Sequence, residues 1–310
     1  MHALPSNQGY EGFIAFLKAH QVTDVTVIIK MLLQANPASK ELHAQVYVLK
    51  SWLDEFRPLA ADVAWELKKR FDTRFTFNSN AIEGNTLTMS ETELVLEKGI
   101  TVGGKTLLEH LEVIGHKEAI DYIEFLAGQD QTISEREIKE IHHLIMKGAD
   151  KSEAGSYRTL DVRAAGTGHQ YPPHYLVQES MANFISWLNS ASANQLTPLQ
   201  LATEVHYKFV AIHPFRDGNG RTARLLMNLV LLRLGYPVVV INNSSRSIYI
   251  DALVYAQEHE HETSKLLNMV TEACIESLLE YLAVASTAAS STGMAEKFYA
   301  EMMGPDASKK

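Results

Sequence analysis

The sequence has a single cysteine, Cys274, among its 310 residues. One cysteine can form neither an internal disulfide nor a cysteine-based zinc site, so the sequence is typical of a reducing compartment, with the thiol packed in a core. The sequence also lacks an apolar run of about 18 residues, the length that predicts a membrane-spanning helix. Residues 1–10 lack the basic start and the apolar stretch of a secretory signal. We therefore predict a cytoplasmic protein without membrane contact.

Basic side chains are also scarce. Lysine and arginine total 28 against 37 aspartates and glutamates, which gives a formal net charge of −9. This balance disfavours broad contact with nucleic acid, although a local basic pocket remains possible. Hydrophobic residues make up 46% and charged residues 21% of the chain, as in ordinary globular proteins. That composition excludes a largely disordered or fibrous chain.

Apolar residues recur every three or four positions along most of the chain, which predicts a mainly α-helical fold. The predicted helices are 11–34, 41–70, 90–98, 105–127, 134–147, 176–190, 198–212, 220–234, 246–258 and 262–284. The segment 155–173 instead alternates its side chains and has a glycine-rich centre, which predicts a short β-hairpin. Residues 286–310 are rich in alanine, serine and threonine and are predicted to form a flexible tail.

Residues 99–106, GITVGGKT, match the phosphate-loop pattern of nucleotide-binding proteins. A true phosphate loop follows a buried strand, which presents the backbone N–H groups of the loop to the phosphates. Here Ser90 and Glu93 have the spacing of a capping box at the start of a helix, and Gly99 stands where a left-handed C-cap is expected. We therefore interpret the stretch as a turn between two helices.

Residues 211–235, AIHPFRDGNGRTARLLMNLVLLRLG, combine the end of one helix, a polar loop and a second helix. Pro214 disfavours a helical backbone at His213, so the first helix must stop there and the imidazole must lie on the loop. His213 is the group in this stretch that titrates near neutral pH, and it could take a proton from an incoming hydroxyl. A histidine at a helix end can equally be structural.

The loop leads into the second helix through Gly218, Asn219 and Gly220. Unpaired N–H groups and the positive dipole end of that helix favour a bound phosphate. Arg221 and Arg224 share one face in the first turns, where a cation opposes the dipole by roughly 0.3–1 kcal/mol. They therefore need an anion, which is either a bound polyphosphate or a carboxylate from elsewhere in the chain. A plain surface pair of arginines is the alternative.

Asp217 adds a carboxylate to the loop that holds His213 and residues 218–220. Magnesium is commonly held by one or two carboxylates together with phosphate oxygens and water, so a carboxylate beside a phosphate-binding turn is its usual protein ligand. Asp217 can also be an ordinary turn residue. The combination of these residue types, more than any one of them, favours an active site.

Residues 213–224, HPFRDGNGRTAR, resemble the signature of Fic-domain proteins: His, any, Phe, any, acidic, Gly, Asn, Gly, Arg, two residues, Arg. The resemblance extends over about residues 70–285. Tyr157 and Arg158 resemble the start of the family's flap hairpin, and residues 112–119 resemble the helix before it. Arg246 and Tyr249 resemble the helix after the signature. The resemblance implies a Fic-type helical bundle with a short β-hairpin flap, in a catalytic domain over 71–285 that follows an N-terminal helical region over 1–70.

The resemblance also implies roles for single residues. His213 is the implied base that deprotonates a Ser, Thr or Tyr hydroxyl of a target protein, and Asp217 the implied ligand of Mg²⁺ or Mn²⁺ on the α- and β-phosphates of ATP. The implied nucleotide contacts are Gly218, Asn219 and Gly220 to phosphate oxygens, Arg221 to the β-phosphate region, Arg224 to the γ-phosphate and Tyr249 beside the adenosine. Gln257 departs from the family, since many relatives have Asn there.

Residues 79–85, SNAIEGN, resemble the family's inhibitory helix, in the class where that helix precedes the catalytic core. The resemblance implies that Glu83 pairs with Arg224 and occupies the space of the γ-phosphate. Two arginines at a helix N-terminus also favour a nearby anion when ATP is absent. The plainer alternative is that Ser79 and Glu83 only stabilise a helix.

The expected activity is therefore transfer of AMP from ATP to a protein hydroxyl, with pyrophosphate as the leaving group. A kinase or a phosphocholine transferase on the same scaffold is the first alternative, and it is disfavoured because kinase-like relatives have Lys at the position of Gly220. A module that only senses nucleotide is the second, and the intact His213 argues against it. The target protein, removal of AMP, a homodimer and the role of residues 1–70 stay open.

The remaining histidines carry no predicted chemistry. His142 and His143 are adjacent on a predicted helix, and His259 and His261 alternate, so neither pair shares a face. His206 is predicted to be packed or exposed, not catalytic.

Overall fold

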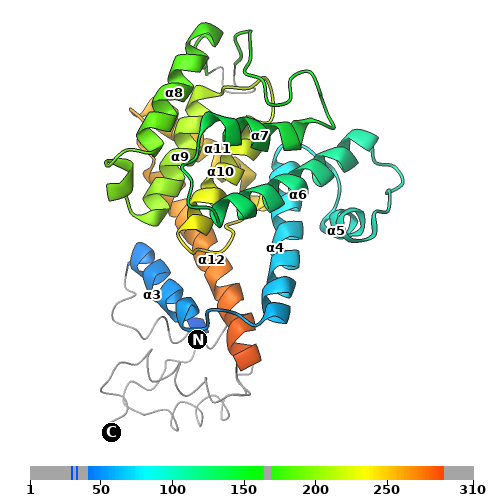
Figure 1. Ribbon diagram of the computed structural model, residues 1–310, viewed down its shortest axis with the longest axis vertical. Helices are drawn as coiled ribbons and strands as arrows, with labels where there is room; N and C mark the ends of the chain where they lie inside the picture. The colour runs from blue at the N-terminus through cyan, green and yellow to red at the C-terminus, as the bar shows by residue number, and fades with distance from the viewer. Residues whose placement is uncertain (1–28, 31–32, 34–40, 164–168, 290–310) are drawn as a thin grey trace. The chain divides into compact units, whose positions relative to one another are not determined.

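The computed structural model describes residues 29–30, 33, 41–163 and 169–289, with side chains up to residue 285. The described chain is mainly helical, as predicted, and Figure 1 shows its helices in order. They are α3 (Leu42–Glu55), α4 (Ala61–Ile82), α5 (Met89–Lys98), α6 (Leu107–Ala127), α7 (Glu135–Met146), α8 (Val177–Leu188), α9 (Pro198–Ile212), α10 (Asn219–Arg233), α11 (Arg246–Glu258) and α12 (Ser264–Ala289). Short 3₁₀ turns occur at η2 (His174–Leu176), η3 (Ala193–Gln195) and η4 (Asn243–Ser245).

The chain divides into two compact units, one of residues 70–270 and one of residues 1–69 with 271–310. Every residue of the predicted site lies in the first unit. Within the described residues, none of the helices combines the length and the apolar character needed to cross a bilayer. The predicted tail largely lies outside the described residues, and its first four residues, 286–289, still belong to α12.

The helix predicted over 41–70 is in fact two helices. Helix α3 ends at Glu55, α4 begins at Ala61, and Pro58 lies between them. Proline has no N–H for the helical ladder and disfavours the helical backbone of the preceding residue, which explains the break. Helix α4 then continues to Ile82, well past the predicted end at residue 70. The predicted helix 11–34 lies almost wholly outside the described residues.

Helix α10 lies in the middle of the 70–270 unit, where it packs mainly against α9, α6 and α7 (Figure 1). Its side chains are buried on nearly every face, as expected for a helix surrounded by others. The buried apolar members are Ala223, Leu225, Leu226, Met227, Leu229, Val230 and Leu231. Asn228 is buried among them and bonds the backbone of Val239 in both directions, at 2.9 and 2.7 Å. Helix α10 is therefore held by packing on several sides and by the bonds of Asn228.

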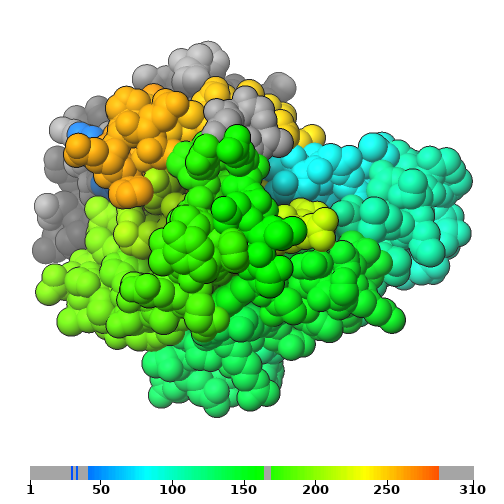
Figure 2. Space-filling view, turned by 90° about the horizontal axis from the view of Figure 1, so that it is seen from above, coloured from blue at the N-terminus to red at the C-terminus, as the bar shows by residue number. Residues whose placement is uncertain are grey.

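The turn with the phosphate-loop pattern connects α5 to α6, as predicted. Gly99 adopts a left-handed backbone with φ 61° and caps α5. The capping box, however, is formed by Thr88 and Glu91, two residues before the predicted pair, because Thr88 is the last residue with an extended backbone. Thr106 caps α6 with Glu109, so its hydroxyl serves helix capping. Helix α5 and this turn, teal in Figures 1 and 2, lie at the side of the unit, and the described residues before the turn form a helix, not a strand.

The β-hairpin predicted over 155–173 is not confirmed. The described residues of this segment contain no strand, and one antiparallel bridge joins Arg163 to Gln170. The turn between them, residues 164–168, lies outside the described residues. A buried side chain explains the lack of a ladder: Arg158 takes the carbonyls of Leu160 and Pro172 that strand pairing would use.

Candidate active site

His213 is held at the C-terminal end of α9, as Pro214 predicts. Its backbone is left-handed, with φ 51° and ψ 58°, and its N–H bonds the carbonyl of Phe209 at 3.0 Å. A residue with a Cβ is strained in this region, and such strain tends to occur at functional sites. The ring atom Nδ1 lies 3.4 Å from the carbonyl of Val210, which leaves Nε2 for a substrate proton.

The environment of His213 keeps its imidazole neutral. Burial lowers the pKa of His213 to about 4, an effect larger than the opposing influence of the Val210 carbonyl. The nearby positive charge of Arg158 lowers the pKa further. Because a general base must be unprotonated before it can act, the side chain is competent as a base at neutral pH.

The loop after His213 is closed by Asn219. Its side-chain Oδ1 accepts a bond from the N–H of Phe215 at 3.0 Å, and its Nδ2 donates to the carbonyl of Phe215 at 2.9 Å. The first bond of helix α10 runs from the N–H of Thr222 to the carbonyl of Gly218 at 3.0 Å, so the N–H groups before Thr222 precede the helical ladder. The side chain of Asn219 therefore shapes the turn, and the backbone N–H groups of a helix N-terminus are the groups suited to an anion.

His142 of α7 supports this loop, a role that the sequence reasoning missed. Its Nδ1 accepts a bond from the N–H of Gly155 at 2.9 Å, which identifies Nε2 as the donor to the carbonyl of Asp217 at 3.0 Å. Its ring stacks on Phe215 with centroids 3.5 Å apart and planes within 1°. Burial lowers the pKa of His142 to about 4, so the neutral form that both bonds require persists at neutral pH.

Asp217 presents its carboxylate to solvent, with 73% of the side chain exposed. Its Oδ1 accepts a bond from the N–H of Gly218 at 2.6 Å, and Oδ2 lies 3.9 Å from Nη2 of Arg221. Among the described residues, no three His, Cys, Asp or Glu side chains form a metal cage. One accessible carboxylate beside a helix N-terminus fits Mg²⁺, which takes most of its ligands from phosphate and water.

Arg224 is buried and paired with Glu83. Its Nη2 lies 2.7 Å from Glu83 Oε1 and 2.8 Å from the carbonyl of Ser79, while Nε donates to the Ser79 hydroxyl at 3.0 Å. Its Nη1 lies 3.3 Å from the hydroxyl of Tyr249, which is also buried. Glu83 follows the last residue of α4 and keeps 38% of its side chain exposed. The guanidinium is thus fixed by its neighbours, while its counterion is open to solvent.

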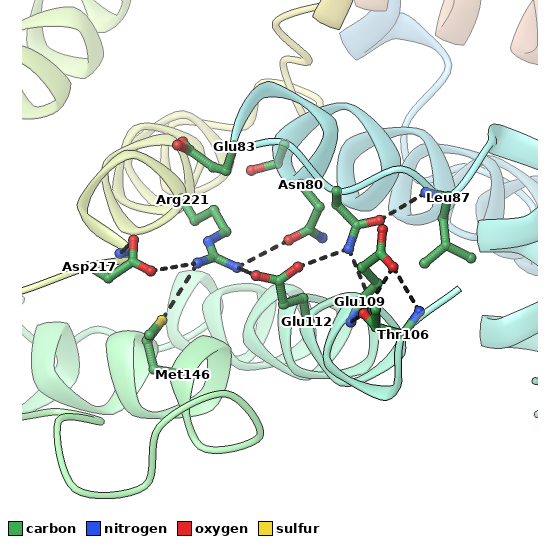
Figure 3. A network of polar contacts seen from close by, with 12 residues as sticks. Asn80, Glu83, Leu87, Thr106, Glu109, Glu112, Met146, Asp217 and Arg221 are labelled. Carbon is green, nitrogen blue, oxygen red and sulfur yellow. Dashed lines mark hydrogen bonds and ion pairs between the residues drawn. The ribbon is translucent and has the colours of Figure 1, made fainter. Parts of the chain in front are cut away.

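Arg221 has a different partner. Its Nη1 bonds Glu112 Oε1 of α6 at 3.0 Å, and the other oxygen of Glu112 accepts from Nδ2 of Asn85 at 2.9 Å. Figure 3 shows this network continuing to Asn80 and Met146, which lie at 3.5 and 3.6 Å from the guanidinium nitrogens. The two arginines do pair with carboxylates from elsewhere in the chain, one of the two options that the charge argument left open. Glu112 as a partner was not predicted.

Two more histidines lie buried beside these arginines. His206 Nε2 is hydrogen-bonded to the Tyr249 hydroxyl at 2.9 Å, and His116 Nδ1 is hydrogen-bonded to the Thr76 hydroxyl at 3.3 Å. Burial lowers the pKa of His206 to about 3 and that of His116 well below its usual value, and in both cases the charge of Arg224 adds to the effect. Both imidazoles are therefore neutral, so the arginines carry the positive charge of the site. His206 is packed, which is one of the two placements predicted for it.

Gly220 leaves the space that Glu83 fills. A Cβ atom on residue 220 would lie 2.3 Å from Glu83 Oε1 and 3.2 Å from Nη1 of Arg224. Real Cβ atoms essentially never come so close to another heavy atom. The carboxylate of Glu83 therefore lies directly over the first turn of α10, where a phosphate group would otherwise meet the helix N-terminus.

The segment 155–173 covers His213. Arg158 is buried and donates from Nε to the carbonyl of His213 at 2.8 Å, while its own N–H bonds the carbonyl of Pro214 at 3.0 Å. The ring of Tyr171 stacks on the imidazole of His213, with centroids 3.8 Å apart. The structure thus brings His213, Asp217, residues 218–220, Arg221, Arg224, Tyr249, Ser79 and Glu83 into one region, all in the same unit.

The chain is similar to a known protein family and to named members of it. Residues 132–231 match the Fic/DOC family. The chain is similar to the protein adenylyltransferase Fic of Nematostella vectensis, with 34% identity over 77% of this chain and 60% of that protein. It is also similar to the protein adenylyltransferase fic-1 of Caenorhabditis elegans, with 39% identity over 64% of this chain and 40% of that protein. The chain thus spans only part of the length of both relatives.

Solved structures give the same picture. A Fic domain containing signaling protein from Bacteroides thetaiotaomicron is similar with a TM-score of 0.72 and 30% identity, covering 80% of this chain and 97% of that one. Residues 134–508 of Fic-1 from C. elegans are similar with a TM-score of 0.70 and 30% identity, covering 90% of this chain and 78% of that one. The similarity therefore extends well beyond residues 132–231.

Proposed function

The chain belongs to the Fic/DOC family, and on this basis we propose that it is a protein adenylyltransferase, which transfers AMP from ATP to a Ser, Thr or Tyr hydroxyl of a target protein. The observation that carries the proposal is the neutral His213 beside the N-terminus of α10, where Arg224 supplies a buried positive charge. This arrangement offers a base, a helix N-terminus and an arginine, so it can position a hydroxyl and a phosphate without using a protein nucleophile. Direct transfer to a bound hydroxyl suits it best.

In the proposed reaction, Nε2 of His213 accepts the proton of the target hydroxyl, whose oxygen attacks the α-phosphorus of ATP. The bond from the α-phosphorus to the bridging oxygen breaks, and pyrophosphate leaves. The backbone N–H groups at 218–220 hold phosphate oxygens, as helix N-termini do. Arg224 neutralises the γ-phosphate, Arg221 supplies positive charge toward the β-phosphate, and Tyr249 lines the adenosine side. Asp217 is the residue that would hold Mg²⁺, whose chemistry is to neutralise phosphate charge and orient the triphosphate.

We also propose that the described conformation is the inhibited one. Glu83 occupies Arg224 at 2.7 Å and lies against Gly220, the two positions assigned to phosphate contact. Ser79 supports the same arginine through its hydroxyl and its carbonyl. Because Glu83 and a γ-phosphate would compete for one guanidinium, ATP binds productively only when the carboxylate withdraws. The same carboxylate is a candidate to position water for removal of AMP from a modified target.

Replacing Glu83 by glycine tests both the activity and the brake. We expect Glu83→Gly to raise AMP transfer at least about tenfold over the wild type, a gain of about 1.4 kcal/mol in effective transition-state stabilisation. Purified proteins are incubated with Mg²⁺ and ATP labelled at the α position, and labelled protein is measured. Glu93→Gly, in the exposed face of α5, is the matched control and should not change the rate. Adding His213→Ala should abolish labelling in every background.

The position of the label separates the alternatives. Transfer of the α label supports an adenylyltransferase, transfer of the γ label identifies a kinase, and labelling by neither, with nucleotide still bound, identifies a nucleotide-sensing module. Gly220 disfavours the kinase, because kinase-like relatives have a lysine at this position, and a side chain there would displace Glu83 from its present place. If folded Glu83→Gly binds ATP but shows no increase, the proposed brake is wrong.

Further predictions concern the protein as a whole. We propose that residues 71–285 are the catalytic domain, that residues 1–70 recognise a partner, support the core or form a contact in a homodimer, and that 286–310 are a flexible tail. The buried thiol of Cys274 supports a reducing, cytoplasmic location. Mass spectrometry of a lysate treated with the Glu83→Gly variant, searched for a mass increase equal to AMP, would identify the target.

A further inference from the structure

Something other than a hydrogen bond must hold the imidazole of His213 in place. In many active sites a carboxylate orients the catalytic histidine through Nδ1, but here Nδ1 meets only the carbonyl of Val210 at a long 3.4 Å. The neighbouring Arg158 bonds the backbone carbonyl of His213 and so fixes the main chain, not the ring. Rotation about the bond between Cβ and the ring is therefore weakly restrained by hydrogen bonding alone.

Tyr171 supplies the missing restraint. Its ring lies on the face of the imidazole, with centroids 3.8 Å apart and planes 14° apart. The backbone beside the tyrosine is held in place, because the carbonyl of the next residue, Pro172, accepts a bond from the buried Arg158. The side chain of Tyr171 lines the same cavity as Gln257 of α11. A ring anchored in this way can define the plane of the ring stacked on it.

We propose that Tyr171 is a positioning residue for His213, which fixes the imidazole plane so that Nε2 faces the hydroxyl to be deprotonated and shields one face of the ring from water. This inference rests on the proposed function, since it assigns His213 the role of base. Tyr171 itself exchanges no proton in the reaction. Its contribution is orientation, which matters because small displacements of a catalytic group are costly in rate.

The surroundings of Tyr171 indicate what its removal would do. Tyr171 also lines a cavity of about 520 Å³, together with Tyr207, Gln257 and His261. Truncating the ring would join this cavity to the face of the imidazole and admit water. The charged groups near His213 are Arg158, Glu83 and Asp217, and none of them is altered by this change. Rehydration alone should therefore raise the pKa of His213 from about 4 toward its ordinary value near 6.5.

The test compares Tyr171→Ala with Tyr171→Phe, each in the full chain with and without Glu83→Gly. The pKa of His213 is read by NMR of the ¹⁵N-labelled imidazole, and kcat and KM for ATP are measured from pH 5 to 8.5. We expect the alanine variant to raise the pKa of His213 by at least about one unit and to lower kcat at least about tenfold, with KM for ATP changed less than about twofold. Tyr171→Phe keeps the stacked ring and should leave the pKa within about 0.3 units. Tyr175→Ala, at an exposed tyrosine outside the site, is the matched control.

The two readouts separate the inference from the function on which it rests. If no background transfers AMP, the proposed function fails, while NMR still decides whether Tyr171 shields His213. If Tyr171→Ala is folded and leaves both the pKa of His213 and kcat unchanged, Tyr171 has no positioning role. If the alanine variant unfolds, Tyr171→Leu provides the same comparison with a bulky side chain that cannot stack. A rise in KM for ATP with unchanged kcat would overturn the inference by making Tyr171 a nucleotide contact.

Discussion

Arg221 and Arg224 lie three positions apart on α10, yet their carboxylate partners differ in exposure. Glu112 is 18% exposed and is itself bonded by Asn85, whereas Glu83 is 38% exposed and follows the end of a helix. Arg224 also bonds the Ser79 carbonyl and hydroxyl, two partners other than Glu83. The pair of Arg221 with Glu112 is therefore structural, and the pair of Arg224 with Glu83 can be exchanged for a ligand.

This difference predicts unequal losses of stability. Glu112→Ala leaves a buried guanidinium without its counterion, and we expect the free energy of unfolding to fall by about 3 kcal/mol. Glu83→Ala should lower it by no more than about 1 kcal/mol, since the exposed carboxylate is screened by solvent. Urea unfolding of the full-length variants measures both values. Equal losses would contradict the division of roles, and Glu118→Ala, which breaks an exposed pair with Lys147, is the control.

Single residues were predictable where one local rule decided them. Pro214 predicts that the helix stops at His213, although not the left-handed backbone found there. The charges of the two arginines predict an anion beside them, either a polyphosphate or a carboxylate. The partner of Arg221 depends on how α6 crosses α10, which no local pattern contains. His142 was dismissed because its neighbour His143 points elsewhere. A signal was available, since His142 follows Ile138 by four residues and therefore shares its buried face.

At the scale of elements, the end of α4 is held by the region around α11. Nε of Arg246 donates to the carbonyl of Ile82 at 2.7 Å, and the N–H of Asn243 donates to Oδ1 of Asn78 at 2.8 Å. The carbonyls at a helix C-terminus have no partners within the helix, so the bond from Arg246 supplies one for the last residue of α4. The bond from Asn243 holds a side chain one turn earlier in the same helix. Because Glu83 directly follows this turn, α11 sets the position of its carboxylate.

We therefore expect Arg246→Ala to weaken the proposed brake. Loss of the bond to Ile82 should loosen the residues around Glu83 and raise AMP transfer several-fold, by less than Glu83→Gly. The α-labelled ATP assay measures the rate, and Ser247→Ala, at an exposed neighbour, is the control. In the Glu83→Gly background the same substitution should add nothing. A further rise there would show that Arg246 acts by another route.

Helices were read from the sequence more reliably than the segment 155–173. Thr197 with Gln200 forms a capping box and Pro198 occupies the first turn, so α9 begins where the predicted helix does. The signal for a β-hairpin is weaker. Alternating apolar and polar residues indicate a half-buried strand only if the backbone N–H and C=O groups of neighbouring strands also pair with each other. Here the guanidinium of Arg158 takes those carbonyls, a tertiary contact that alternation cannot reveal.

At the scale of the whole molecule, the 70–270 unit buries four histidines in neutral form. Burial lowers the pKa to about 4 for His142 and His213, to about 3 for His206, and well below the ordinary value for His116. In the unfolded chain each would titrate near 6.5. The unfolded state therefore binds more protons than the native state below that pH, and stability must decrease as the pH falls.

The expected pH profile follows from these values. The stabilisation is fully present above about pH 6.5 and is lost progressively as the pH falls toward 4, at up to about 1.4 kcal/mol per pH unit for each histidine. Thermal unfolding midpoints measured between pH 7.5 and 4.5 test it. His206→Asn, which cannot be protonated, should make the profile less steep, whereas replacing the exposed His259 should not. A flat profile for the unsubstituted chain would contradict neutral burial.

The contact between Gly220 and Glu83 restricts how such a sequence can diversify. Since the position of a Cβ on residue 220 lies 2.3 Å from Glu83 Oε1, a lysine there cannot coexist with the glutamate in its present place. A relative that acquired a lysine at this position would also have to lose this glutamate or move it elsewhere. Such a relative would then need another way to inhibit its activity. Across related genes, the two residues should therefore be mutually exclusive.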